Sequence, residues 1–384
     1  MQVPNTSEQK ANKLAFLDGF RGLACVYVVL YHFWFELSIA YSSILTQNIK
    51  SYFRFLNFGN CSVAAFIAIS GYCLMLSTVR SSSDTLKNGW REFLIRRCRR
   101  ILPGYYVCLL LGIVLMNGSD VLHKSLLFQN AIPVDMFSGV ISHLLLIHNI
   151  NQNWVFNINP PLWSVAVEWQ IYFMYAFVMM PLYSRFKANS LLLSGAALSV
   201  VLFAISRLPI AFSNKFFWPH SWFVFIFALA AYAAWYNYRV AIKGMSDAAR
   251  LMFVSAILAA FCLLSVLFFT RDDKWLEHHN YIVELLSGGI SIGVMVLCID
   301  AILGNKKSFL VGFLSLPFLV FLGKISYSIY LYHCFVMAVV IFLVMKYLGA
   351  GFLSVFATLS LALSLVVLLS YFSYKYVERP FMRV

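Results

Sequence analysis

The sequence predicts an all-α polytopic membrane protein. Of its 384 residues, 61% are hydrophobic and 11% are charged, which is too apolar for a domain surrounded by water. A membrane-spanning helix needs about 20 mainly apolar residues, and about ten stretches of that kind follow one another with short connections. We therefore expect one membrane domain over residues 1–384, with no appended soluble domain.

The basic residues give the expected orientation of these spans. The spans are predicted at 21–39, 58–78, 101–117, 163–181, 190–206, 220–236, 251–269, 282–302, 325–347 and 352–374. Ten spans place both termini on one side, and cytoplasmic loops are enriched in Lys and Arg. Most of the 29 basic residues fall on the side of the termini. We expect both termini in the cytoplasm and the chain in the inner membrane, so the net charge of +14 reflects topology, not nucleic-acid binding.

Two segments depart from the alternation of spans and loops. Residues 118–162 are too long for a simple loop and are expected to hold surface-lying or re-entrant helices. Residues 311–322 are apolar but short and are interrupted by Pro317, so we expect them at the membrane interface. The eight cysteines are scattered, without C-x-x-C pairs or zinc-ligand spacing, and no metal is expected.

Ionisable side chains inside a span cost about 3 kcal/mol or more, so each marks a candidate functional site. Arg21 and His32 in the first span return to within about 20° of one helix face, about 16.5 Å apart along the axis. Glu36 shares this face, and Asp18 could hold the Arg21 guanidinium. Alone, His32 is equally consistent with helix packing and Arg21 with a lipid headgroup contact. Their shared face favours a polar path.

The ninth span carries a second polar stripe. Ser326, Tyr330 and His333 fall at helical spacing on one face, and the direction of the span places His333 about 12 Å from its cytoplasmic end. This depth is similar to that of His32. The two histidines are therefore expected near the middle of the bilayer.

The fourth span runs in the opposite direction and carries Ser164, Glu168 and Tyr172 on one face. Glu168 lies about 7.5 Å below the outer surface, which differs from the depth of His32 by only about 6 Å in a core about 30 Å thick. Glu168 and His32 could line one cavity. The alternative is that Glu168 pairs with a structural arginine.

Four arginines enter the third span in the run Arg96-Arg97-Cys98-Arg99-Arg100. Guanidinium groups suit phosphate recognition, although a simple positive-inside anchor explains such a cluster as well. Ser70-Gly71-Tyr72 in the second span offers a small residue for close helix approach and two hydroxyl groups. Most triplets of this kind serve packing.

In their order along the chain, these residues resemble the acyltransferase-3 family of integral-membrane O-acyltransferases. The resemblance rests on Leu17-Asp18-Gly19-Phe20-Arg21-Gly22-Leu23 followed by Tyr31-His32, on Ile69-Ser70-Gly71-Tyr72, on Arg97-x-x-Arg100-Ile-Leu-Pro103, on Leu162-Trp163-Ser164 to Glu168, on Ile325 to His333, and on Val377-Glu378-Arg379-Pro380. The six matches cover nearly the whole chain. Two positions depart from the family pattern: Trp169 stands where many members have a second acid, and Cys61-Ser-Val-Ala-Ala-Phe66 is less aromatic than usual.

The resemblance implies transfer of an acyl group, most often acetyl from acetyl-CoA, to a hydroxyl of an extracytoplasmic or lipid-linked glycan of the cell envelope. Arg21, Arg97 and Arg100 would hold the coenzyme A phosphates. His32 would remove the acceptor proton or receive the acyl group. Glu168 would bind the acceptor from the outer side, and His333, Tyr330 and Ser326 would stabilise the oxyanion or position substrate. Supporting roles would fall to Asp18, Glu36, Ser70, Tyr72, Trp163 and Ser164.

Other functions fit parts of the same pattern. Ionisable residues near the bilayer midplane also suit a secondary transporter or a carrier of lipid-linked sugars, which does not require the arginine cluster. A catalytically inactive scaffold is disfavoured by the intact Arg21 and His32 pair. Within the enzymes, the donor could be succinyl or a longer acyl chain, and the acceptor a macrolide, a lipid or a peptidoglycan unit.

Overall fold

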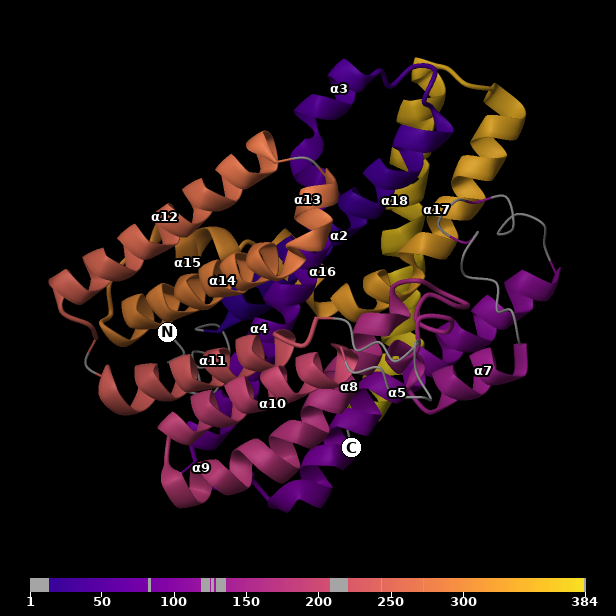
Figure 1. Ribbon diagram of the computed structural model, residues 1–384. Helices are drawn as coiled ribbons and strands as arrows, with labels where there is room; N and C mark the ends of the chain where they lie inside the picture. The colour runs from indigo at the N-terminus through magenta and orange to yellow at the C-terminus, as the bar shows by residue number, and fades with distance from the viewer. Residues whose placement is uncertain are drawn as a thin grey trace, which may run out of the picture.

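The computed structural model describes residues 14–81, 84–118, 125, 128, 136–207, 220–242, 244–271 and 273–382. Over these ranges the chain forms a bundle of helices joined by turns, without a β-sheet (Figure 1). The predicted all-α architecture is therefore confirmed. The polar N-terminus and most of 119–135, which is part of the predicted outer segment, lie outside the described residues.

Nine helical stretches within these ranges are long and apolar enough to cross a membrane. They are α2 (Ala15–Ala40), α4 (Asn60–Val79), α5 (Gly89–Gly118), α8 with its continuation (Leu162–Phe186), α10 (Asn189–Arg207), α12 (Asp247–Thr270), α14 (Asn280–Leu303), α17 (Ser326–Leu348) and α18 with its continuation (Phe352–Met382). Each coincides with one predicted span. The remaining prediction, 220–236, corresponds to the shorter α11 (Phe223–Trp235). The chain is a multi-pass membrane protein, and the side on which its termini lie stays a prediction.

Two of these stretches contain a π turn and a third π turn follows α11; such local widenings are frequent near functional sites. They are η3 (Tyr175–Met179) between α8 (Leu162–Met174) and α9 (Met180–Phe186), η4 (Tyr236–Val240) after α11, and η5 (Tyr374–Glu378) between α18 (Phe352–Ser373) and α19 (Arg379–Met382). The η5 turn carries Glu378, whose buried carboxylate accepts a hydrogen bond from Ser328 of α17. This contact ties the last two spans together.

Shorter helices fill the connections. They are α3 (Gln47–Tyr52), η1 (Arg54–Asn57), α7 (Met136–Leu144), η2 (His148–Ile150), α13 (Asp273–His278), α15 (Phe309–Leu314) and α16 (Pro317–Lys324). The segment predicted at the interface, 311–322, thus forms two helices, because Pro317 can begin a helix but not continue one. Both pack against α2.

The first span, α2, lies among α4, α16 and α17 (Figure 1). Its contact with α16 depends on glycine, because a Cβ on Gly22 would clash with the Leu319 carbonyl and one on Gly323 with the Asp18 carbonyl. Because glycine has no side chain, the backbones of α2 and α16 can approach each other closely. This close contact therefore fixes the end of α2 that carries Arg21.

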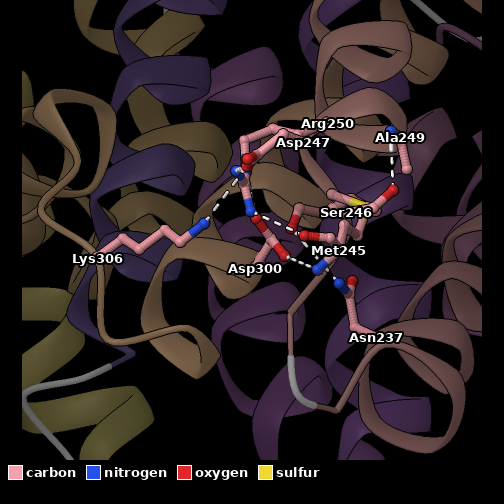
Figure 2. A network of polar contacts seen from close by, with 9 residues as sticks. Asn237, Met245, Ser246, Asp247, Ala249, Arg250, Asp300 and Lys306 are labelled. Carbon is pink, nitrogen blue, oxygen red and sulfur yellow. Dashed lines mark hydrogen bonds and ion pairs between the residues drawn. The ribbon is translucent and has the colours of Figure 1, made fainter.

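A polar network fixes the connection from α11 to α12 onto the end of α14 (Figure 2). The buried Asp300 carboxylate accepts hydrogen bonds from the Met245 backbone N–H and from Arg250 Nε, the latter at 2.8 Å. Ser246 caps α12 by accepting from the Ala249 N–H at 3.2 Å. Because Asp300 is only 1% exposed, its charge is tolerated only through these partners. The network lines neither of the cavities described below.

The glycine contact between α2 and α16 leads to a stability prediction. Substitution Gly323→Ala should lower the unfolding free energy by about 1–3 kcal/mol, because the added methyl has no room against the α2 backbone. Gly312→Ala in α15 is the matched control, since nothing lies within 4 Å of its Cβ position and alanine favours helix. Thermal unfolding in detergent would measure the stability of both variants. Equal midpoints for the two variants would contradict the packing argument.

Candidate active site

Many of the polar residues predicted on α2, α4, α5, α8 and α17 line one cavity of about 390 Å³. His32 does not line it, so the expectation that Glu168 and His32 share one cavity is not met. The walls of this cavity include predicted site residues from all five helices: Arg21, Ser70, Arg97, Arg100, Ser164, Glu168, Ser326 and Tyr330. These positions are up to about 300 residues apart in the chain, so only the packing of the bundle brings them together. The structure thus supports the prediction that they form one site.

This first cavity is strongly cationic. Five basic side chains line it, namely Arg21, Lys87, Arg96, Arg97 and Arg100, against the single carboxylate of Glu168. Such an excess of partly desolvated positive charge favours an anion with several oxygens. Arg97 stacks over the Tyr172 ring at 5.8 Å, and its buried Nε atom has no hydrogen-bond partner among the described residues.

Arg21 is held in place from two sides. Its Nη1 donates to Asp18 Oδ1 at 3.1 Å, as the sequence predicted, and its Nη2 contacts Cys73 Sγ at 3.5 Å. The Arg21 side chain is only 17% exposed. The guanidinium is therefore oriented in advance at the wall of the cavity and loses little conformational freedom on binding an anion.

Hydroxyl groups connect the polar residues deeper in the cavity. The Tyr172 hydroxyl donates to Glu168 Oε1 at 2.5 Å and lies 2.9 Å from Ser70 Oγ. The hydroxyl oxygens of Ser164 and Tyr330 are 2.6 Å apart. Glu168 lies in the arginine-lined cavity. Its expected role in binding the acceptor from the outer side stays a prediction.

His32 and His333 form a hydrogen-bonded pair. His333 Nδ1 lies 2.8 Å from the Tyr330 carbonyl oxygen, which can only accept, so this nitrogen carries the proton. His333 Nε2 is consequently an acceptor, and it lies 3.0 Å from His32 Nδ1, which also faces the Val28 carbonyl at 3.0 Å. His32 Nδ1 therefore carries its proton. The lone pair of His32 is left on Nε2, available to a substrate.

Cys334 lies beside this pair. The ligand atoms of His32, His333 and Cys334 fall within 4.8 Å of one another, and such nitrogen and sulfur donors suit a soft divalent metal. The facing nitrogens of the two imidazoles, however, share a hydrogen bond, and His32 Nδ1 carries a proton in that arrangement. A metal at this place would have to displace that proton, so the arrangement favours acid–base chemistry.

A second cavity, of about 590 Å³, opens beside the other end of α2. Tyr31, Trp34, Phe35 and Ser38 contribute to it from α2, and residues from 50–60 and 276–283 complete the wall. Tyr31 packs its ring edge against His32, with the ring centroids 4.6 Å apart. Along α2, His32 thus lies between Arg21 in the first cavity and Trp34 in the second.

Three of the predicted supporting residues make structural contacts away from the cavities. The Glu36 carboxylate is buried and accepts a hydrogen bond from Ser125 at 2.8 Å. The Tyr72 hydroxyl donates to Asn237 Oδ1 at 2.8 Å, which holds α4 against η4. Trp163 packs its ring on aromatic side chains at the start of α11. These three line neither cavity.

The structure also adds residues that the sequence did not single out. Lys87 lies in the connection before α5, and Tyr327 donates from α17 to the Ile101 carbonyl at 2.9 Å. The four-arginine run could have indicated Arg96, since it is part of that cluster. Lys87 has no such signal, because a lone lysine in a polar connection is usually solvated.

Two further histidines stack close to α8. The rings of His143 and His148 are parallel within 8°, with centroids 3.8 Å apart, and both are fully buried. Their spacing of five residues does not fit one helix face. The chain leaves α7 through Leu146, which has a φ of 52°, and this turn brings the rings together. Gln170 of α8 donates to the Leu146 carbonyl at 3.0 Å, so this turn is anchored beside the site.

Comparison with known proteins agrees with this geometry. The profile of a family described as an acyltransferase domain matches residues 14–374. The O-acetyltransferase OatA of Staphylococcus aureus strain NCTC 8325 / PS 47 is 24% identical over 95% of this chain and 56% of its own length. A protein of strain COL, SACOL0978, whose name assigns it provisionally as an O-acetyltransferase, is 25% identical over 98% of this chain and 58% of its own length. No solved structure matches the chain.

The fold and the cavities define a multi-pass membrane protein with a cation-lined site and a partly buried imidazole pair. The family match covers most of the chain, so the chain belongs to this acyltransferase family. The resemblance drawn from six short motifs is confirmed. The chain spans little more than half the length of the curated relatives it matches.

The stacked histidines lead to a prediction for pH dependence. Burial lowers the pKa of His143 to about 4 and the pKa of His148 well below its usual value. Between about pH 6.5 and 4 the unfolded chain therefore binds protons that the folded chain does not, and stability should fall by roughly 1 kcal/mol per pH unit as the pH decreases. His148→Phe, which keeps a stacked ring, should reduce this loss.

Thermal unfolding in detergent from pH 7 to pH 5 would test this prediction. His278→Phe is the matched control, because His278 is exposed. The wild-type chain and the control should lose more stability than His148→Phe. Three parallel curves would contradict the assignment.

Proposed function

We propose that the protein is an O-acyltransferase that moves an acyl group, preferably acetyl, from acyl-CoA to a hydroxyl of an extracytoplasmic or lipid-linked glycan. The observation that carries the proposal is the position of His32, between a cation-lined cavity and a second cavity along the same helix. A transferase for two substrates on opposite sides of a membrane needs this arrangement. The names of the relatives, which include O-acetyltransferase, agree with it.

The first cavity suits the donor. Coenzyme A is a multiply charged phosphate ester, and guanidinium forks bind phosphate through paired N–H groups. These phosphate contacts would be made by Arg97 and Arg100, near the start of α5, and by Arg21. The pantetheine arm would then extend past Ser164 and Tyr330 toward the histidine pair. In the inner membrane this cavity would face the cytoplasm, where acyl-CoA is made.

The second cavity suits the acceptor, and the reaction follows from the tautomers of the histidine pair. His32 Nε2 removes the proton of the acceptor hydroxyl as the oxygen attacks the thioester carbonyl carbon. The new ester C–O bond forms, the C–S bond breaks, and the sulfur leaves with the proton from His32. His333 acts as a positioning residue, because its Nε2 accepts the His32 Nδ1–H at 3.0 Å.

Hydroxyl groups beside the pair could stabilise the negative oxygen of the tetrahedral intermediate. Tyr330 is the best placed, since it lines the first cavity and its ring centroid lies 5.8 Å from that of His333. Ser164, 2.6 Å from the Tyr330 hydroxyl, would orient it. Glu168 and Tyr172 would shape the inner end of the donor site.

Removal of the base should abolish transfer. His32→Ala should lower kcat by about 10²–10⁴-fold with acetyl-CoA binding retained, because the hydroxyl then loses its proton acceptor. His333→Ala should lower kcat less and shift the pH profile of kcat, since His32 loses the partner that fixes its tautomer. Coenzyme A release with added cell-envelope glycans measures both. A His32→Ala protein that still acylates would overturn the assignment.

The arginines should control donor affinity. Arg97→Gln should raise the KM for acetyl-CoA by about tenfold, because one charge-assisted phosphate contact is lost, with a smaller effect on kcat. Arg99→Gln is the matched control, because Arg99 follows in the same run but does not line the cavity. Equal KM values for the two variants would place the donor elsewhere. A transporter of sugars would show no coenzyme A release in any variant.

A further inference from the structure

The second cavity combines side chains of three chemical kinds. Trp34 and Phe58 give it aromatic faces, Asn60 and Asn280 give it carboxamides, and Lys50 gives it an ammonium group. The cavity has a volume of about 590 Å³. This volume is within the range of sites for small molecules, which are mainly apolar with a few placed polar groups.

The aromatic and amide groups suit a sugar ring. Trp34 is half-buried and packs against Phe53 at a centroid distance of 4.9 Å, which fixes the plane of its ring. An aromatic face can cover the apolar C–H face of a saccharide, while carboxamides both donate to and accept from its hydroxyl groups. Asn57, Asn60 and Asn280 supply three carboxamides in the wall. A lipid chain would leave these amides unpaired.

The charge in this cavity is of one sign. Lys50 and Arg54 both line it, and none of the described residues that line it is acidic. Both cations are half-buried. The Arg54 guanidinium also donates to the Arg271 carbonyl, which anchors it beside α13. Partly desolvated cations bind an anion more strongly than exposed ones do.

The cavity is also close to the reactive imidazole. Tyr31 forms part of its wall and contacts His32 through ring centroids 4.6 Å apart. Gly59 makes this position possible, because a Cβ there would clash with the Tyr31 ring. Trp34 follows His32 by two residues, about 3 Å along the axis of α2, and Tyr31 connects the wall of this cavity to the base.

We infer that the acceptor is a saccharide with an anionic group, a carboxylate or a phosphate, which Lys50 and Arg54 bind while the sugar ring lies on Trp34. This inference rests on the proposed function and narrows its acceptor class. A uronic acid and a sugar phosphate both present sugar hydroxyl groups close to several anionic oxygens. Both cations recognise those oxygens.

Binding of matched saccharide pairs tests the inference with the full chain in nanodiscs. The first pair is a glucuronate-containing tetrasaccharide and its carboxyl methyl ester; the second is N-acetylglucosamine 1-phosphate and N-acetylglucosamine. Quenching of tryptophan fluorescence reports binding, because Trp34 is in the wall. At least one charged member should bind about tenfold or more tightly than its neutral partner. The pair that shows the preference identifies the anion.

Variants connect this preference to the two cations. The double variant Lys50→Gln/Arg54→Gln should remove the preference and leave acetyl-CoA binding unchanged. Lys346→Gln is the matched control, because Lys346 is at the end of α17 and lines neither cavity. Equal binding of charged and neutral members by the wild-type chain, or no binding of any, would overturn the inference. So would a double variant that keeps the preference.

Coenzyme A release separates this inference from the proposed function. A wild-type chain that acylates glycans but binds charged and neutral saccharides equally refutes only the anionic acceptor. A chain that prefers the charged saccharides but never releases coenzyme A with any glycan refutes the acyl transfer and leaves a saccharide-binding site. The two failures therefore give different results in the same preparation.

Discussion

The hydrogen bond between His32 and His333 is the contact on which the proposed chemistry of this protein depends. Two neutral imidazoles can share their hydrogen bond in either direction, and in one of these directions His32 Nε2 would carry a proton and could not act as a base. The backbone carbonyls of Tyr330 and Val28 remove this ambiguity, because a carbonyl can only accept. The helices themselves, through their own backbone, thus set which nitrogen carries the lone pair.

Electrostatics explains why the proposed donor site would lie where α5 begins. Five basic side chains around one carboxylate repel one another, and a bound phosphate ester would relieve this repulsion. Aromatic rings reduce this repulsion in part, since Arg97 lies over Tyr172 and Phe93. The glycine contact of α2 with α16 keeps Arg21 in the same wall. Packing and charge therefore cooperate at this end of the bundle.

The sequence predicted the spans and many of the polar residues of the first cavity, for identifiable reasons. Apolar length specifies a span, and an ionisable residue inside one stands out against lipid, as Arg21, His32 and Glu168 do. Partnerships between distant segments were not predictable. The pairing of His32 with His333 depends on the rotation of two helices 301 residues apart in sequence, which periodicity does not determine. Glu168 was expected to bind the acceptor because its depth along the helix is close to the outer surface. Depth along one helix does not determine which neighbouring helix a side chain faces, so its place beside the arginines was not predictable.

The position of the histidine pair between two tyrosines bears on how water is kept from the thioester. Tyr330 lines the first cavity and Tyr31 the second, and each packs its ring near one of the two imidazoles. His32 itself lines neither cavity. Each cavity thus has an aromatic ring beside the imidazole pair. In the proposed reaction a sugar held on Trp34 gains binding energy that brings its hydroxyl to His32, whereas a water molecule makes no such contact and gains none.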